Sequence, residues 1–542
     1  MSKKDKIKFD IIVVIAIIFL AAAFIPKSLQ EDTFYMIKVG EYICQNGMGV
    51  VAERIEPFAW HEGMIYTYPH WLLDIIFYLI YNVFQFTGIY VFTVIFGIII
   101  YLLVYITNVK ACKNRIISAI ITLATIYLFR GYITARAQIV TYFCCILTLL
   151  FIERFLENPK RRYMVGLVIV PIILANCHAA LFPMYFVLYL PYIAAYIMSF
   201  LTREEILSKL LKFKNKRLTK LEKKGKIEKV EKIKTKIEKI QEKLETIKVE
   251  NKTKTRKVII ERNENVKYLI LLCIACIITG FITPLRDIPF TYTIKSLKGN
   301  TMNFISEHQA VALTKMPSLI VSFVVLAITL FSTKTKIKLQ DLFMVIGMSI
   351  LAIISYKQFP IFWIGVMCII NKLIFMMIDE KKLEKIKKIE TKALSFMGMV
   401  YTIMIIIIIF LYNYKSISKQ SYVNTNDYPV VAAEWMKNNI DMDKMYLFND
   451  FNYGSYLLFK DIPVFIDGRA DAYDPVFNGM NEDPFLDYML TSSGQKWYGD
   501  TFKKYNITHI ITTKDSLLDM LLQRNIVYKN IYNDGSFVIY ER

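Results

Sequence analysis

Apolar runs recur along most of this sequence and limit what it can fold into. Of the 542 residues, 55% are hydrophobic. Stretches of about 14 to 20 apolar residues, long enough to cross a membrane as a helix, return between short polar loops. The runs are continuous rather than alternating, which excludes a β-barrel. The sequence therefore predicts a polytopic α-helical membrane protein.

Lysine-rich loops indicate how many of these runs cross the membrane. Cytoplasmic loops are enriched in Lys and Arg. If residues 71–86 do not cross, every lysine-rich loop falls on the side of the amino terminus, whereas a crossing there moves the first two loops to the other side. The charges therefore favour about eleven spans over twelve, with the amino terminus in the cytoplasm and the carboxyl terminus outside. The predicted spans are 11–25, 89–108, 115–129, 137–153, 163–176, 181–200, 267–283, 317–332, 341–355, 359–378 and 394–413.

Residues 70–86 resemble a span but carry a polar stripe. Their polar side chains recur every three or four residues, which places them on one face of a helix. An amphipathic helix in the membrane interface fits this pattern better than a lipid-surrounded span, in which the carboxylate of Asp74 would be costly. The alternative is a true span whose polar face meets other helices. The stripe comprises His70, Asp74, Tyr78, Tyr81, Asn82 and Gln85.

Changes in composition divide the chain into four parts. Residues 1–200 form a first membrane module with the outer loop and the interfacial helix, and residues 267–415 form a second module. The insert between them, residues 201–266, holds 22 Lys and Arg against 11 Asp and Glu, about half of the net charge of +21. Residues 416–542 are less apolar and are predicted to form an extracytoplasmic domain.

The basic insert has the pattern of a helical hairpin. Apolar residues from Val230 to Ile247 are spaced alternately three and four apart, which is a heptad seam, and Lys223–Lys226 has the composition of a turn. We therefore predict an antiparallel hairpin on the cytoplasmic side. Pairing of the seam with another chain is the alternative. The basic surface suits either anionic lipid heads or a solvated spacer.

The carboxyl-terminal part alternates short apolar runs with helical segments. This alternation predicts a small α/β domain with a partly parallel sheet, and an α+β cap is the alternative. The predicted strands are Met445–Phe448, Val464–Ile466, Ile507–Ile511 and Phe537–Tyr540, and the predicted helices are Val430–Asn438, Phe485–Leu490 and Ser516–Leu522.

Acidic and basic side chains gather at the predicted outer ends of the spans. Glu31 and Asp32 directly follow the first span. A carboxylate can take a proton from an acceptor hydroxyl or hold a divalent cation, and Arg or Lys can bind a phosphate. With an interfacial helix as a ledge for a lipid tail, these groups suit an extracytoplasmic transferase with a lipid-linked donor. The phosphate-binding candidates are Arg136, Lys357 and Arg130, and further substrate-site candidates are His178, Glu307, His308, Asp74, Gln358, Asp467 and Arg469.

Each candidate also has a purely structural interpretation. Acids that follow a span can be ordinary solvated loop residues, and an arginine at a helix end can extend to the interface without any ligand. His178 can be a packing residue, and Asp467 can simply form a turn. For such single residues the turn-forming interpretation is slightly favoured, whereas the domain as a whole is expected to face the substrate, because open α/β sheets bind ligands at the edge where their strands end.

Several classes of protein are disfavoured. No glycine-rich nucleotide loop, HExxH zinc site or GxSxG nucleophile elbow occurs. The eight cysteines show no ligand spacing beyond Cys273–Cys276, which lies inside a predicted span and is interpreted as packing. The positive charge lies mainly in cytoplasmic loops, which accounts for it without a nucleic-acid partner.

The layout of the first 200 residues resembles the GT-C superfamily of membrane glycosyltransferases. Glu31–Asp32 lies in the first outer loop, and Tyr68–Leu79 then leads through Gly88 into the next span. The resemblance is to protein O-mannosyltransferases and the catalytic subunits of oligosaccharyltransferases. It implies a polyprenyl-phosphate or polyprenyl-diphosphate sugar donor, Asp32 as the catalytic acid or base with Glu31 beside it, and a divalent metal such as Mg²⁺ or Mn²⁺ at these two acids.

Two local departures from the mannosyltransferase pattern leave metal dependence open. The loop reads Glu-Asp where those enzymes have Asp-Glu, and the interfacial helix has only Pro69 in place of paired prolines. The later part of the chain is similar to a group of bacterial multi-span proteins with an outer carboxyl-terminal domain. The segments that carry this similarity are Asn176–Ala179, Ile305–His308, Lys357–Phe362, Phe448–Leu457 and Val464–Tyr473.

The expected function is transfer of a sugar to an extracytoplasmic acceptor in a bacterial plasma membrane. The acceptor would be a cell-envelope glycan, a lipid or a protein. One alternative is a glycolipid transporter or flippase, which should show charged or broken helices at mid-membrane. Another is a non-catalytic scaffold with an outer binding domain, self-associating or binding a partner through the insert.

Overall fold

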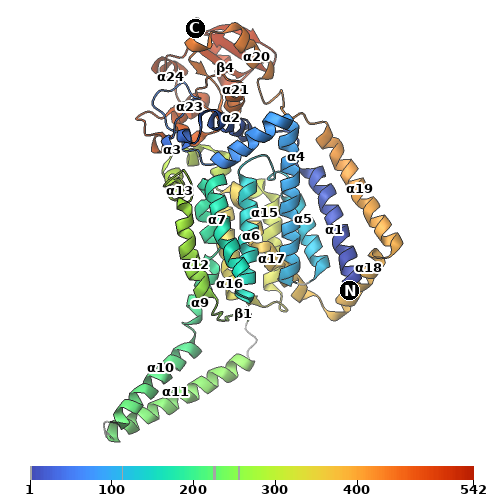
Figure 1. Cartoon of the computed structure of the whole chain (residues 1–542), viewed down its shortest axis with the longest axis vertical. Coiled ribbons are helices and arrows are strands. Elements are labelled where there is room, and N and C mark those ends of the chain that lie inside the picture. The colour runs from blue at the N-terminus through green and yellow to red at the C-terminus, as the bar shows by residue number, and fades with distance from the viewer. Residues whose placement is uncertain (1–2, 113, 224–226, 254–256) are drawn as a thin grey trace.

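The computed structural model of the chain has three levels (Figure 1). It describes residues 3–112, 114–223, 227–253 and 257–542. A helical bundle forms the middle, and a mixed domain covers one end, called here the domain end. A two-helix hairpin projects from the opposite end, called the hairpin end, near which the amino terminus also lies.

The bundle consists of apolar helices that coincide with the predicted spans. Six helices are long and apolar enough to cross a membrane, and four shorter helices are also apolar, within the described part of the chain. The membrane class predicted from the sequence is therefore confirmed. The bundle helices are α1 (Lys3–Phe24), α4 (Trp71–Cys112), α5 (Arg115–Leu128), α6 (Gln138–Glu157), α7 (Arg161–Cys177), α8 (Phe182–Val187), α9 (Leu190–Ser199), α12 (Val266–Ile278), α15 (Pro317–Phe331), α16 (Leu339–Ile354), α17 (Phe359–Met377) and α19 (Phe396–Ser418).

Helix α4 bends where the sequence analysis separates an interfacial helix from a span. Gln85 has φ 54° and ψ −156°, so the helix is broken there. The first arm lies across the domain end of the bundle and the second arm runs down through it (Figure 1). Helix α2 (Glu31–Asn46) packs on the first arm. A Cβ on Gly40 would lie 2.0 Å from the carbonyl oxygen of Asp74, so this approach requires glycine.

The insert forms the predicted hairpin from α10 (Arg203–Glu222) and α11 (Ile227–Thr253). Seam residues Ile233, Ile237 and Ile240 are buried, so the seam is covered within one chain. Of the predicted turn, residues 224–226 lie outside the described part. The base of the hairpin is tied to the bundle by the parallel pairing of β1 (Val258–Ile259) with β2 (Ile337–Lys338).

The mixed domain contains a four-stranded sheet in the order β3-β4-β6-β5, with β3 parallel to β4 and the other neighbours antiparallel. The partly parallel sheet is thus confirmed. The strands are β3 (Leu447–Phe448), β4 (His509–Thr513), β5 (Lys529–Asn533) and β6 (Phe537–Glu541), and the helices are α20 (Val430–Asn439), α21 (Phe451–Phe459), α22 (Pro475–Asn478), α23 (Pro484–Ser492), α24 (Tyr498–Lys504) and α25 (Leu517–Leu522).

One predicted strand of this domain is wrong. Val464–Ile466 is buried but does not join the sheet; Val464 instead forms an isolated parallel bridge with Ala59 of the outer loop. Three consecutive apolar residues indicate that a segment is buried, but not that it joins a sheet. Here the loop that contains Ala59, far away in the sequence, covers the segment. The mixed domain and the loop after α2 are therefore joined by a backbone bridge.

The remaining helices connect these parts. The outer loop after α2 contains α3 (Gly49–Glu53), the loop after α12 contains α13 (Ile288–Lys298) and α14 (Thr301–Phe304), and α18 (Glu380–Ala393) precedes α19 at the hairpin end.

Candidate functional site

A cavity of about 780 Å³ lies at the domain end, where the bundle meets the mixed domain. Its lining includes residues of α2, of the loops at the domain end of the bundle helices and of the domain segment 468–472. It brings together most of the residues singled out in the sequence, which are separated by hundreds of positions. These are Glu31, Asp32, Arg136, His178, Glu307, His308, Lys357, Gln358 and Arg469.

Arg136 is the hub of the charged groups in this cavity. Its Nε donates to Oδ2 of Asp32 at 2.5 Å, and its Nη1 donates to Oε1 of Glu307 at 3.1 Å. Burial would raise the pKa of Glu307, but Arg136 and Lys357 outweigh that and hold it below its ordinary value. The guanidinium therefore serves two carboxylates and holds both in place.

The two acids of the first outer loop face different partners. Only Oδ2 of Asp32 is hydrogen-bonded to a described residue, so Oδ1 is left for a substrate. Glu31 Oε1 accepts from the Ser455 hydroxyl of the domain at 3.1 Å. Burial and the neighbouring Asp32 raise the pKa of Glu31 well above its ordinary value. Glu31 thus contacts the domain, whereas Asp32 contacts Arg136 and keeps one oxygen without a partner among the described residues.

Lys357 is the cation of the cavity that is not engaged by an acid. Its Nζ donates to Nε2 of His308 at 2.9 Å, and no described carboxylate forms an ion pair with it. Burial and the charge of Lys357 together lower the pKa of His308 to about 4, so this histidine is a neutral acceptor. Lys357 is therefore a suitable ligand for an incoming anion.

Two neutral histidines form another wall. The rings of His70 and His178 lie 5.3 Å apart, and His178 Nδ1 is 2.7 Å from the hydroxyl of Thr141. Burial, together with the positive charges of Lys357 and Arg136, lowers the pKa of His70 to about 3. These rings offer hydrogen bonds rather than charge. The sequence analysis placed His70 only on the polar stripe; its place beside Pro69, where the loop enters α4, was the available signal.

Arg469 borders the cavity, but its charge is already compensated. It contacts Glu56 of the outer loop at 2.7 Å and Asp467 at 2.6 Å, and all three side chains are at most 1% exposed. We call these three residues the clamp, because they join the outer loop to the domain. The sequence analysis proposed Asp467 and Arg469 as substrate ligands; the structure uses them to hold the two parts together, and it adds Glu56.

Two further candidates lie away from the cavity lining. Arg130 is exposed and stacks over the ring of Tyr127, with its guanidinium carbon 4.5 Å from the ring centroid. Asp74 is fully buried, and neither of its carboxylate oxygens has a hydrogen bond in the described part of the chain.

Glu31 and Asp32, the two acids expected to hold a metal, each have a protein partner in this arrangement. Asp32 is engaged by Arg136 and Glu31 by Ser455. No group of three His, Cys, Asp or Glu side chains within the described residues could hold an ion. The chemistry below is therefore derived without a metal-dependent step.

Comparison with solved structures identifies the architecture. No family model and no curated protein matches the sequence. The structure is similar to the crystal structure of ArnT from Cupriavidus metallidurans bound to undecaprenyl phosphate, with a TM-score of 0.50 and 10% identity, over 100% of this chain and 98% of that chain. ArnT is a GT-C glycosyltransferase, so the similarity over the whole chain shows the GT-C fold that the first 200 residues led us to expect.

Proposed function

We propose that this GT-C-fold chain is an integral-membrane glycosyltransferase. It would move a sugar from a polyprenyl-phosphate-linked donor to an extracytoplasmic hydroxyl of a cell-envelope glycan, a lipid or a protein. The observation that carries the proposal is one cavity that combines a carboxylate with a free oxygen and a lysine without a carboxylate partner. The undecaprenyl phosphate bound by ArnT supports the donor class.

The geometry suggests a role for each group. Oδ1 of Asp32 takes the proton of the acceptor hydroxyl while that oxygen bonds to the anomeric carbon, and the polyprenyl phosphate leaves with the electrons of the broken bond. Lys357 binds the phosphate and stabilises the charge that develops on it. Arg136 orients Asp32 through the Nε contact and completes the phosphate side of the cavity. The neutral rings of His70 and His178 are placed to bond sugar hydroxyls.

Substitution of the two adjacent acids tests this assignment. Membranes carrying Asp32→Asn should lose transfer from a radiolabelled polyprenyl-phosphate sugar by roughly 100-fold or more, because the amide cannot accept the proton. Glu31→Gln should retain most of the activity, because a neutral amide can still accept the Ser455 hydrogen bond. Full activity in Asp32→Asn would refute the mechanism, and a large loss in Glu31→Gln alone would move the catalytic role to that residue.

The proposed setting is a bacterial plasma membrane with the domain end outside. The hairpin, the lysine-rich loops and the amino terminus then lie in the cytoplasm, in agreement with the charge distribution. In this orientation the cavity opens where envelope acceptors and a translocated lipid-linked donor meet.

A further inference from the structure

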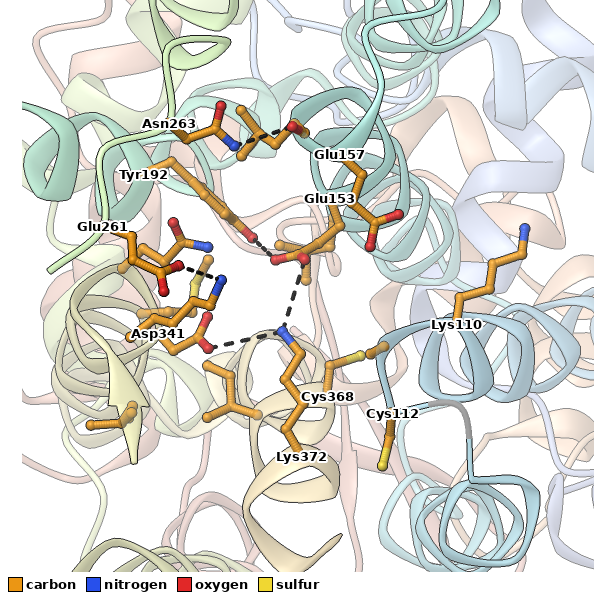
Figure 2. A pocket seen from close by; sticks show the side chains of 18 of the residues that line it. Lys110, Cys112, Glu153, Glu157, Tyr192, Glu261, Asn263, Asp341, Cys368 and Lys372 are labelled. Atoms are coloured by element: carbon orange, nitrogen blue, oxygen red, sulfur yellow. Dashed lines mark hydrogen bonds and ion pairs between the residues drawn. The ribbon is translucent and has the colours of Figure 1, made fainter. Parts of the chain in front are cut away.

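A second cavity lies at the hairpin end of the bundle, opposite the proposed catalytic site. Its volume is about 660 Å³. The last turns of α4, α6 and α17 surround it together with the start of α16 and the loop that follows the hairpin. Figure 2 shows Glu153, Asp341 and Lys372 pointing toward one another from three different helices. None of them takes part in the transfer proposed above.

The inner part of this cavity carries an excess of negative charge. Lys372 Nζ lies between Glu153 and Asp341, 3.8 Å and 3.9 Å from their oxygens, and forms no hydrogen bond with a described residue (Figure 2). Glu153 also accepts from the hydroxyl of Tyr192 at 2.8 Å. Asp341 is only 7% exposed and accepts no hydrogen bond within the described part of the chain. Two carboxylates thus share one loosely placed ammonium, and a buried carboxylate in this state is suited to a hydrogen-bonding cation.

The rim of the same cavity presents cations that have no acid of their own. Lys110 and Lys336 are exposed and form no ion pair with any residue that the structure describes. In contrast, Lys338 is paired with Glu261 at 2.9 Å. An anionic group at this rim would therefore meet lysines whose charge no described acid neutralises.

We propose that this cavity binds the phosphoethanolamine headgroup of a phospholipid in the leaflet at the hairpin end. The ligand joins a phosphate, suited to Lys110 and Lys336, to a primary ammonium whose three N–H donors suit Asp341 and Glu153. A lipid is favoured over a soluble zwitterion because one part of the lining, on the bundle helices, consists of apolar side chains. Among them are Leu149, Leu150, Met344, Ile369, Leu373 and Met376.

Direct lipid binding tests this site. Delipidated full-length protein in detergent is titrated with phosphatidylethanolamine, phosphatidylcholine or phosphatidylglycerol of identical chains, and bound lipid is counted by native mass spectrometry. Phosphatidylethanolamine should bind about tenfold more tightly than the other two, because a trimethylated amine has no N–H donor and glycerol has no cation. Equal binding of the ethanolamine and choline lipids, or preference for phosphatidylglycerol, overturns the proposal.

Variants inside and outside the cavity show whether phosphatidylethanolamine binds there. Asp341→Asn should weaken phosphatidylethanolamine binding about tenfold, the size of effect expected for one charge-assisted contact. Lys336→Ala should weaken it severalfold and, as a change at an exposed side chain, does not endanger folding. Lys334→Ala is the control, because Lys334 pairs with Asp379 outside the cavity. Unchanged binding in Lys336→Ala overturns the proposal, as does competition by soluble phosphoethanolamine at the same concentration as the lipid. The readout is independent of sugar transfer.

Discussion

Lys357 is the residue whose substitution most directly tests the phosphate side of the proposed reaction. No carboxylate of the described residues pairs with this cavity lysine, so its charge is available to the donor. We expect Lys357→Met to raise the KM for the polyprenyl-phosphate donor and to lower kcat/KM by roughly 10- to 100-fold, the range for a charged hydrogen bond lost with its phosphate partner. Lys357→Arg should recover part of the loss. Initial rates over a range of donor concentrations measure both effects.

Lys298→Met is the matched control for that experiment. Lys298 is an exposed lysine at the same end of the molecule and does not line the cavity. Its substitution should leave kcat/KM within about twofold, because a surface charge contributes little. If both lysine variants lose the same activity, the effect is one of general surface charge and the phosphate assignment fails.

His61 makes the contact between the outer loop and the domain sensitive to acid. Its Nε2 is 2.8 Å from the carbonyl oxygen of Phe465, and burial lowers the pKa of the ring to about 4, with a smaller contribution from Lys504. The unfolded histidine titrates near 6.5, so below that pH the unfolded chain binds a proton that the folded chain refuses. Folding stability should therefore decline as pH falls from about 6.5 towards 4.

Apparent melting temperatures of the purified protein at pH 7.5 and pH 5 check this expectation. His61→Gln can still donate to the Phe465 carbonyl but does not titrate, so its melting temperature should fall less between the two pH values than that of the parent protein. Each pKa unit of difference corresponds to ~1.4 kcal/mol. Identical pH dependence in the two proteins would show that other groups control acid stability.

The location of a single residue was predictable where one physical rule places it. Asp32, Arg136 and Lys357 were expected at the same ends of predicted spans, where charged groups can stay outside the apolar core, and they do line one cavity. Their roles stay predictions. The clamp was not predictable, because Glu56 and Arg469 are separated by 413 positions and their pairing follows from tertiary packing. The contact between Glu31 and Ser455, which distinguishes Glu31 from Asp32, joins residues 424 positions apart. It also follows from tertiary packing and could not be predicted from the sequence.

At the scale of single elements, the accessibility of the first arm of α4 shows whether residues 71–86 cross the membrane. Asn82 and Gln85 are exposed near the bend, as expected of a helix that lies in the interface. Asn82→Cys, made in a Cys44→Ser background because Cys44 is exposed, should react with a membrane-impermeant maleimide applied from outside. Ile95→Cys in the second arm should not react, because that arm lies in lipid. Protection of position 82 would restore a crossing at 71–86.

Helices and strands could be predicted from the sequence where the spacing of polar and apolar residues and the distribution of charge indicated the same element. The polar stripe and the lysine-rich loops both favoured a boundary near residue 86, and the helix is broken at Gln85, close to that boundary; the interfacial position of the first arm stays a prediction. The hairpin seam likewise has one dominant period. Val464–Ile466 failed because three apolar residues carry no period that distinguishes a strand from a buried loop. Its partner, Ala59, belongs to another part of the chain.

At the scale of the whole molecule, the mixed domain is a wall of the proposed active site. Its segment 468–472 lines the cavity, and Asp471 accepts hydrogen bonds there from the hydroxyls of Tyr292 and Thr301. The clamp attaches this segment to the outer loop that bears Asp32. Activity should therefore depend on docking of the domain, even though the proposed acid and phosphate ligands belong to the membrane module.

Arg469→Met tests this dependence. The substitution leaves Glu56 and Asp467 buried without a counter-charge, a change that typically costs about 3 to 5 kcal/mol. It also removes the stacking of the guanidinium over Phe58 and Tyr66, whose ring centroids lie 4.9 Å and 4.8 Å away. The domain should then separate more readily, giving a lower melting temperature, faster proteolysis after α19 and a loss of sugar transfer.

A variant in which all three clamp residues are neutral distinguishes the effect of unpaired buried charge from the effect of lost packing. In the triple variant Glu56→Gln, Asp467→Asn and Arg469→Met no buried charge is left unpaired, and replacing a complete buried ion cluster is often neutral for stability. We expect its melting temperature and protease resistance to return most of the way to those of the parent protein, and transfer activity to return with them. If stability returns without activity, the clamp residues contribute to the reaction itself; if neither returns, the role of the clamp as a charge-balanced tether is wrong.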